Sequence, residues 1–172
     1  NYVPPIQLRE FYLTIAFPGL PKWINASSVP NLSHLSMDVK AMNEQDMDII
    51  GYLPELIGLE LLLPPDVFLS IKGDGLFPKL RCFDTSAPFR FLPGAMPALE
   101  LLHFKVDVRA LKRVGFALDD FATLKNLLRL RSVEVEIDSR GARPVHATGV
   151  EEAVKRTVDN HPNNPTASIR RT

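Results

Sequence analysis

The stretch that decides the fold reads Pro54-Glu55-Leu56-Ile57-Gly58-Leu59-Glu60-Leu61-Leu62-Leu63. Its skeleton is a leucine, a second apolar residue three positions later, and then apolar residues at every other position. This skeleton occurs six times along the chain, and its first leucines are Leu8, Leu32, Leu56, Leu80, Leu99 and Leu130. The spacings between these leucines are 24, 24, 24, 19 and 31 residues, which indicates a repeated structural unit.

Each unit should contain one short strand, because its apolar residues alternate with the period of 2 that gives a strand one buried face. A single unit cannot cover that face, so neighbouring units must stack and bury a continuous core. A period of about 20–29 residues with this pattern is typical of leucine-rich repeats. The alternative is an antiparallel β-sandwich, whose strands usually recur every 8–12 residues or so. The sequence therefore predicts an α/β leucine-rich repeat solenoid of about six repeats, with a parallel concave sheet and an irregular convex side.

The expected parallel strands span 10–15, 34–39, 58–63, 82–86, 101–107 and 132–138, with Ile15 among the inward-pointing residues. On the convex side, Asn43 and the acids after it predict the start of a helix. Residues 67–71 predict an extra short strand, and the prolines of residues 87–97 leave no room for a helix. Asp119-Asp120 should cap a further helix that buries Phe121, Leu124 and Leu128.

Residues 1–147 are expected to form the solenoid and residues 148–172 a C-terminal capping helix followed by a polar tail, all in one continuous domain. Thr148 and Glu151 have the spacing of a capping box. The valines Val150, Val154 and Val158 then follow as one apolar helical stripe. We expect a helix over 148–161 that covers the end of the solenoid, and a frayed segment from Asn163 to Thr172.

The composition is that of an ordinary globular domain of 172 residues, with 45% hydrophobic and 23% charged residues. Its 20 basic and 20 acidic side chains balance, so the overall charge favours neither nucleic acid nor a membrane surface as partner. A single cysteine, Cys82, favours a reducing compartment. No apolar run is long enough to predict a membrane span. The opening Asn1-Tyr2-Val3-Pro4-Pro5 has no initiator methionine or signal peptide, and we expect the chain to be a fragment of a longer protein.

Several stretches resemble the C-terminal leucine-rich repeats of plant coiled-coil NB-ARC disease-resistance receptors, in the form common in grasses. They are Leu20-Pro21-Lys22-Trp23-Ile24, Asp46-Met47-Asp48-Ile49-Ile50-Gly51-Tyr52-Leu53-Pro54-Glu55-Leu56, Gly94-Ala95-Met96-Pro97-Ala98-Leu99, and the ending Glu151-Glu152-Ala153-Val154 through Asp159-Asn160-His161-Pro162-Asn163-Asn164-Pro165-Thr166. The similarity covers nearly the whole chain. The chain departs from the usual repeat where an asparagine or cysteine is expected eight residues after each first leucine. Those positions are Ala16, Lys40, Pro64, Pro88, Asp107 and Asp138.

The resemblance implies a cytoplasmic immune receptor that binds ADP or ATP in a nucleotide-binding module and triggers defence when it senses a pathogen effector. This chain has no Gly-x-x-x-x-Gly-Lys-Ser/Thr loop to bind phosphates, so it needs no cofactor of its own and the nucleotide is expected in a module upstream. The role implied for this domain is protein interaction, in effector recognition and in autoinhibition of that module.

The sequence contains no recognisable catalytic or metal-binding pattern. None of the four histidines has Cys or His partners at metal-ligand spacing, and each is expected to be a surface residue. Cys82 should lie on an exposed strand position with no histidine beside it in its row, which argues against a nucleophilic role. No Gly-x-Ser-x-Gly motif occurs. We therefore expect that the domain is not an enzyme.

The informative surface should be the concave face, where two rows of outward positions cross the strands. The first row is expected to hold Tyr12, Ser36, Glu60, Asp84, His103 and Glu134, and the second Thr14, Asp38, Leu62, Ser86, Lys105 and Glu136. Five of these twelve positions are acidic and one is basic, and the acids Glu134, Glu136 and Asp138 concentrate at the C-terminal end. Two interpretations stay open: a solvated face that only keeps the sheet soluble, or a docking surface for a basic protein partner.

Three classes of protein use such a domain. The immune-receptor sensor is the preferred interpretation, with an effector or the receptor's own nucleotide-binding module as the partner. The second is the substrate-binding repeat domain of an F-box ubiquitin ligase, which would use the same concave face. The third, an extracellular receptor or inhibitor, should show cysteine-paired caps and Gly-x-Ile-Pro turns, and this sequence has neither.

Overall fold

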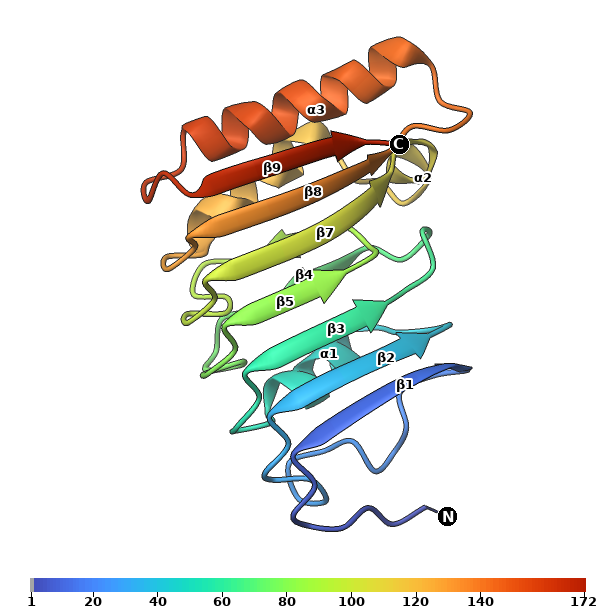
Figure 1. The fold of residues 1–172 in the computed structure, drawn as a ribbon, viewed down its shortest axis with the longest axis vertical. Helices are drawn as coiled ribbons and strands as arrows, with labels where there is room; N and C mark the ends of the chain where they lie inside the picture. The colour runs from blue at the N-terminus through green and yellow to red at the C-terminus, as the bar shows by residue number, and fades with distance from the viewer. Residues whose placement is uncertain (1) are drawn as a thin grey trace.

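The computed structural model describes residues 2–172, and its main feature is a seven-stranded sheet that runs the length of the molecule (Figure 1). Every neighbouring pair of strands is parallel, which confirms the predicted solenoid and excludes the antiparallel sandwich. In spatial order, the strands are β1 (Glu10–Phe17), β2 (His34–Val39), β3 (Gly58–Leu62), β5 (Cys82–Thr85), β7 (Leu101–Asp107), β8 (Ser132–Asp138) and β9 (Thr166–Arg171).

The equal spacing of the first units places equivalent residues side by side. Leu35 pairs with Leu59, Leu59 with Phe83, and Phe83 with Leu102, and all four side chains are buried. The apolar ladders formed in this way are the core between the sheet and the convex elements. The side chains on one face of the sheet therefore point into the core along the solenoid, and those on the other face point toward solvent.

The first strand departs from the predicted alternation. The register between β1 and β2 shifts after Leu13, so that Ala16 rather than Thr14 lies opposite Asp38. Ile15 is 68% exposed, and the prediction that it points inward is wrong. The cause is a β-bulge, which leaves Thr14 and Ile15 without partners on β2 and so takes Ile15 out of the inward row.

The convex side is irregular, as predicted, and two of its elements match the expectation. Helix α1 (Glu44–Gly51) begins with a capping box in which the Asn43 side chain accepts from the Asp46 N–H and the Asp46 carboxylate accepts from the Asn43 N–H. The extra strand β4 (Leu69–Ile71) is also present. It pairs in parallel with β6 (Phe89–Phe91), which was not predicted, and the two make a second small sheet.

The longest connection folds differently from the prediction. It begins with a short helix, α2 (Val108–Arg113), which the Asp107 carboxylate caps. The expected helix is the 3-10 helix η1 (Leu118–Asn126), where Phe121 and Leu124 are buried as predicted. Leu128 lies beyond its end and is 68% exposed, so the prediction that Leu128 is buried is wrong.

The C-terminal region contains more structure than the sequence predicted. Helix α3 (Pro144–Asp159) buries Val150, Val154 and Val158, as expected of a helix that covers the end of the solenoid. It begins at Pro144, because a proline is favoured in the first helical turn, and not at a capping box of Thr148 and Glu151. Glu151 instead binds Arg171 at 2.6 Å.

Residues 163–172 are not a frayed tail, because Thr166–Arg171 form β9, the last strand of the sheet. The turn into β9 is held by His161, which is only 3% exposed and not the surface residue that was expected. Its Nε2 donates to the Leu124 carbonyl at 3.0 Å, while its Nδ1 accepts from the Asn163 N–H at 3.1 Å. A buried histidine with both nitrogens paired ties the capping region to η1.

Candidate functional site

The candidate site is the face of the large sheet opposite α1, which Figure 1 shows toward the viewer and which we call the open face. Three rows of residues cross it from β1 to β9. The first row is Glu10, His34, Gly58, Cys82, Leu101, Ser132 and Thr166. The middle row is Tyr12, Ser36, Glu60, Asp84, His103, Glu134 and Ser168, and the third row is Ala16, Asp38, Leu62, Lys105, Glu136 and Arg170.

The open face is hollowed along its first and middle rows. A broad groove of about 440 Å³ extends from Tyr12 on β1 to Glu134 on β8. Gly58 and His34 both line this groove. A Cβ atom on residue 58 would lie 2.7 Å from the His34 ring, so the glycine makes room for that imidazole. A groove that crosses six strands of a rigid sheet is suited to an extended contact with another macromolecule.

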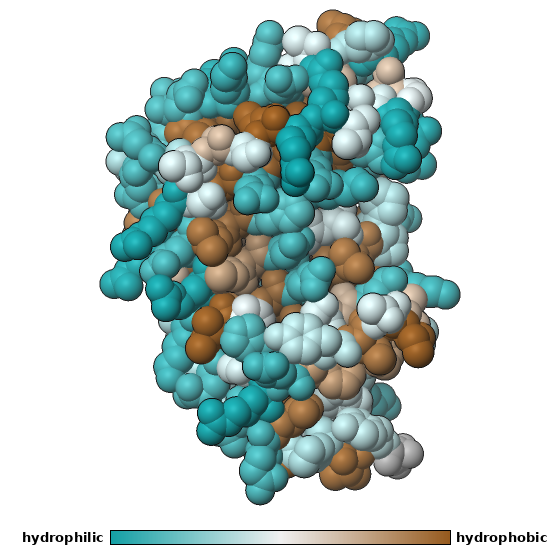
Figure 2. Space-filling view, viewed as in Figure 1, coloured by the Kyte–Doolittle hydropathy of each residue, from teal (hydrophilic) through white to brown (hydrophobic). Residues whose placement is uncertain are grey.

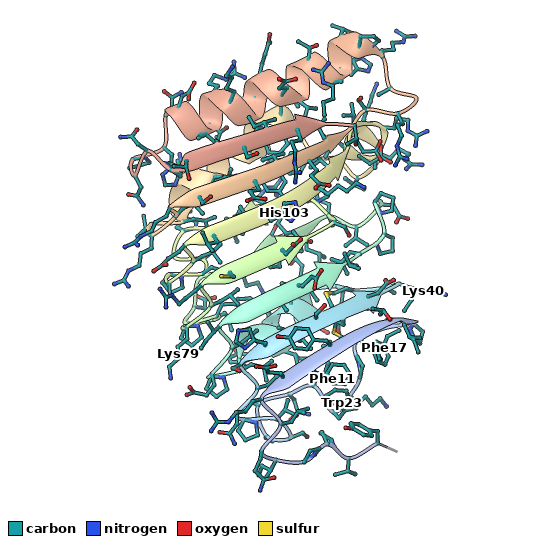
Figure 3. The ribbon with its side chains drawn as sticks, viewed as in Figure 1. Phe11, Phe17, Trp23, Lys40, Lys79 and His103 are labelled. Atoms are coloured by element: carbon teal, nitrogen blue, oxygen red, sulfur yellow. The ribbon has the colours of Figure 1, made fainter. Side chains whose placement is uncertain are left out.

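Hydrogen bonds between neighbouring strands order the middle row. The Ser36 hydroxyl donates to the Glu60 carboxylate at 2.5 Å. His103 lies on β7 at the centre of the face (Figure 3), and its Nδ1 is 2.8 Å from an oxygen of Asp84. The Nε2 atom of His103 is buried without a hydrogen-bond partner among the described residues, 3.7 Å from the Glu136 carboxylate. His103 thus lies between two carboxylates from the strands on either side of it.

The predicted concentration of negative charge at the C-terminal end is wrong, because the structure pairs two of its three acids with arginines. Asp138 is only 8% exposed and binds Arg140 at 2.6 Å. The Arg140 guanidinium and backbone N–H hold the pKa of Asp138 well below its usual range. Glu136 binds Arg170 of β9 at 3.1 Å, and the sequence missed this neighbour because it predicted no strand there.

The carboxylates that keep their charge uncompensated lie elsewhere on the face. Asp38, Glu60 and Glu134 form no ion pair with any residue that the structure describes. They come from β2, β3 and β8, so unpaired negative charge is spread along the open face, and Glu60 and Glu134 bring it into the groove. Lys105, predicted on this face, lies on it opposite Glu136.

Apolar side chains are exposed among these charges, as Figure 2 shows by the brown patches on the open face. Tyr12 is 60%, Leu101 47% and Leu62 43% exposed. Tyr12 and Leu101 line the groove, and aromatic and apolar side chains of this kind are typical contacts in protein interfaces. The open face therefore fits a partner that presents both cations and apolar side chains.

The one free thiol is not arranged for catalysis. Cys82 is exposed, and its neighbours in the row are Gly58 and Leu101, which confirms that no histidine lies beside it; His34 is the nearest histidine of the row. Gly58 separates the two, and two strand spacings amount to about 9.6 Å, far beyond the reach of a nucleophile and its base. No group of three His, Cys, Asp or Glu side chains in residues 2–172 is placed to hold a metal ion. No helix among those residues is long and apolar enough to cross a membrane.

The Asp138–Arg140 pair predicts acid sensitivity. Because the folded protein lowers the pKa of Asp138, this carboxylate stabilises the fold above its unfolded pKa of about 3.9. That contribution is lost as the pH falls through the lower pKa of the folded state. The free energy of unfolding by urea should therefore fall less steeply for Asp138→Asn than for the wild type between pH 5 and the most acidic pH at which both fold. Glu134→Gln, which removes an unpaired acid from the same strand, should keep the wild-type slope, and parallel curves for wild type and Asp138→Asn would contradict this assignment.

The comparison with protein families agrees with this geometry. A family model described as a leucine-rich repeat region matches residues 1–167 of the chain. That match contains β1 to β8 completely and reaches the start of β9, so it includes nearly all of the open face. No curated protein matches the chain closely enough to be reported as a relative.

Proposed function

This chain belongs to the leucine-rich repeat family, and we propose that its open face binds a basic region of a protein partner. Domains of this family generally bind proteins through the extended surface that their stacked strands create. The observation that carries the proposal is the groove lined by Glu60 and Glu134, which, like Asp38 beside it on the open face, have no cationic partner among the described residues. A partner with lysines or arginines opposite these acids and apolar residues opposite Leu62 and Leu101 would complement it.

The acids proposed to contact the partner differ from those that the sequence suggested, which lay at the C-terminal end of the sheet. Arg170 and Arg140 compensate the acids at the C-terminal end, while the acids of β2, β3 and β8 are free. Glu60 and Glu134 are therefore the residues whose charge should matter most for association. Charges of this kind act mainly on the association rate, and salt screens them beyond about 8 Å at physiological ionic strength.

We further propose that the domain is the sensor of a cytoplasmic plant immune receptor and has no enzymatic activity of its own. The support is the resemblance of stretches such as Gly94–Leu99 and Glu151–Thr166 to the repeats of those receptors. In such a receptor the open face would contact either a pathogen effector or the receptor's own nucleotide-binding module, which it would hold inactive. ADP or ATP would be bound by that module and not by this domain.

The receptor proposal predicts a bound nucleotide in the complete protein. Protein purified with its natural upstream sequence, then denatured and analysed by anion-exchange chromatography, should release close to one ADP or ATP per molecule. The domain of 172 residues alone should release none, because it lacks a phosphate-binding loop. A complete protein that carries no nucleotide and copurifies with a ubiquitin-ligase adaptor would contradict the receptor proposal and favour the F-box class.

A further inference from the structure

A second charged surface lies at the edge of the sheet where the strands begin, and it has the opposite sign to the open face. The loops that lead into β5 and β8 carry four exposed cations, Lys79, Arg81, Arg129 and Arg131. Lys79 marks this edge on the left of Figure 3, and Figure 2 shows hydrophilic residues along the same flank. The chain as a whole is neutral. The unpaired acids Asp38, Glu60 and Glu134 lie on the open face, and these four cations lie on a different surface.

The four cations border two adjoining grooves. One groove, of about 400 Å³, is lined by Lys79, Arg81 and the apolar residues Ile57, Pro78 and Ala98. The other, of about 420 Å³, is lined by Leu130, Arg131 and Asn163. Glu100 and Arg129 line both, so the two grooves form one continuous depression along the edge, which we call the edge groove.

The edge groove has more positive charge than its own acids can neutralise. Lys79 binds Glu55 at 2.8 Å and Arg81 binds Glu100 at 3.1 Å. Both pairs are exposed to solvent, and pairs of this kind contribute little and exchange partners readily. Arg129 and Arg131 form no ion pair with any described residue.

The backbone beneath the two free arginines is held firmly. The Arg131 N–H donates to the Glu100 carbonyl at 2.8 Å, and the Arg131 carbonyl accepts from the Thr166 N–H at 2.9 Å. The Asn163 side chain donates to the Leu128 carbonyl at 2.6 Å. A preorganised backbone lowers the entropic cost of binding, so these cations are suited to recognition.

We propose that the edge groove binds an acidic segment of a protein, separately from the basic partner of the open face. An acidic peptide can place carboxylates opposite Arg129 and Arg131 and apolar side chains opposite Ile57 and Pro78. A nucleic acid carries a phosphate at every nucleotide but no aliphatic side chains that could pack against Ile57, Pro78 and Ala98. Cations beside these apolar residues thus favour a peptide.

The test uses a fluorescein-labelled peptide of twelve residues, aspartate with leucine at every fourth position, and fluorescence anisotropy with the intact domain. Binding should be measurable at low salt and should weaken as salt is added. Arg129→Glu together with Arg131→Glu should weaken it by about tenfold or more, because two favourable contacts become repulsive. Lys112→Glu with Arg113→Glu, on exposed positions of α2, makes the same change in net charge and should leave the affinity within about twofold.

Three results would overturn the proposal. The first is an equal loss of affinity in the α2 double variant, since binding would then follow net charge alone. The second is tighter binding of a labelled twelve-nucleotide single-stranded DNA than of the peptide, which would assign the groove to nucleic acid. The third is an absence of peptide binding by the wild-type domain at low salt. Circular dichroism of both double variants confirms that each is folded, because all four residues are exposed.

Discussion

Leu61→Ala is expected to lower the free energy of unfolding by about 2–5 kcal/mol. Leu61 is fully buried in β3, with Met37 of β2 on one side of it and Thr85 of β5 on the other. Truncation to alanine removes apolar contacts on the inner face and leaves a cavity that a rigid sheet cannot close. Chemical denaturation of the purified domain measures the effect directly.

Leu62→Ala is the matched control, since it makes the same chemical change one residue away on the opposite face. Leu62 is 43% exposed on the open face, so its truncation should cost no more than about 1 kcal/mol. If the two variants lost equal stability, the division of each strand into a buried and a free face would be incorrect. A larger loss for Leu62→Ala would reverse the orientation of the sheet.

The periodicity of the sequence predicted the central part of this fold because its cause is local and repetitive. Equal steps of 24 residues place Leu35, Leu59 and Phe83 in register, and the period of 2 then fixes which side chains are buried. The middle-row residues Tyr12, Ser36, Glu60 and Asp84 follow from the same two facts, and His103 and Glu134 follow from the later copies of the skeleton. All six lie on the open face, as predicted.

The predictions that were wrong concern residues whose structure depends on contacts that the repeat pattern does not contain. The strand β9 carries no leucine skeleton, and it forms because its backbone completes the edge of β8. Its Arg170 then neutralises Glu136, which the sequence left as a free acid. The bulge in β1 exposes Ile15, and the turn after β8 buries Asp138 against Arg140, and neither follows from the repeat pattern.

The second large effect is expected in partner binding by the open face and, through it, in the function of the proposed receptor. Glu60→Lys together with Glu134→Lys reverses the charge of the two acids of the groove that form no ion pair, from strands on either side of His103. Both side chains point away from the core, so the fold should be retained. The variant should associate with its basic partner more slowly, and with a weaker dependence on salt, because attraction has become repulsion.

A matched control shows whether the position of the charges matters. Asp66→Lys with Glu152→Lys changes the net charge by the same amount on exposed positions outside the open face. This control should behave like the wild type. Protein levels and thermal unfolding of both variants should be compared first, so that a loss of response is not a loss of folded protein.

On the proposal that the domain belongs to a plant immune receptor, the measurement that tests the open face most directly is cell death in plant cells that express the complete protein, with and without the effector that activates the wild type. We expect the Glu60→Lys, Glu134→Lys receptor to differ from the wild type in one of two ways. Loss of the response to the effector assigns the face to effector binding, and cell death without the effector assigns it to an autoinhibitory contact within the receptor. A folded double variant that responds normally and stays silent without the effector would contradict the proposal that this face binds a partner.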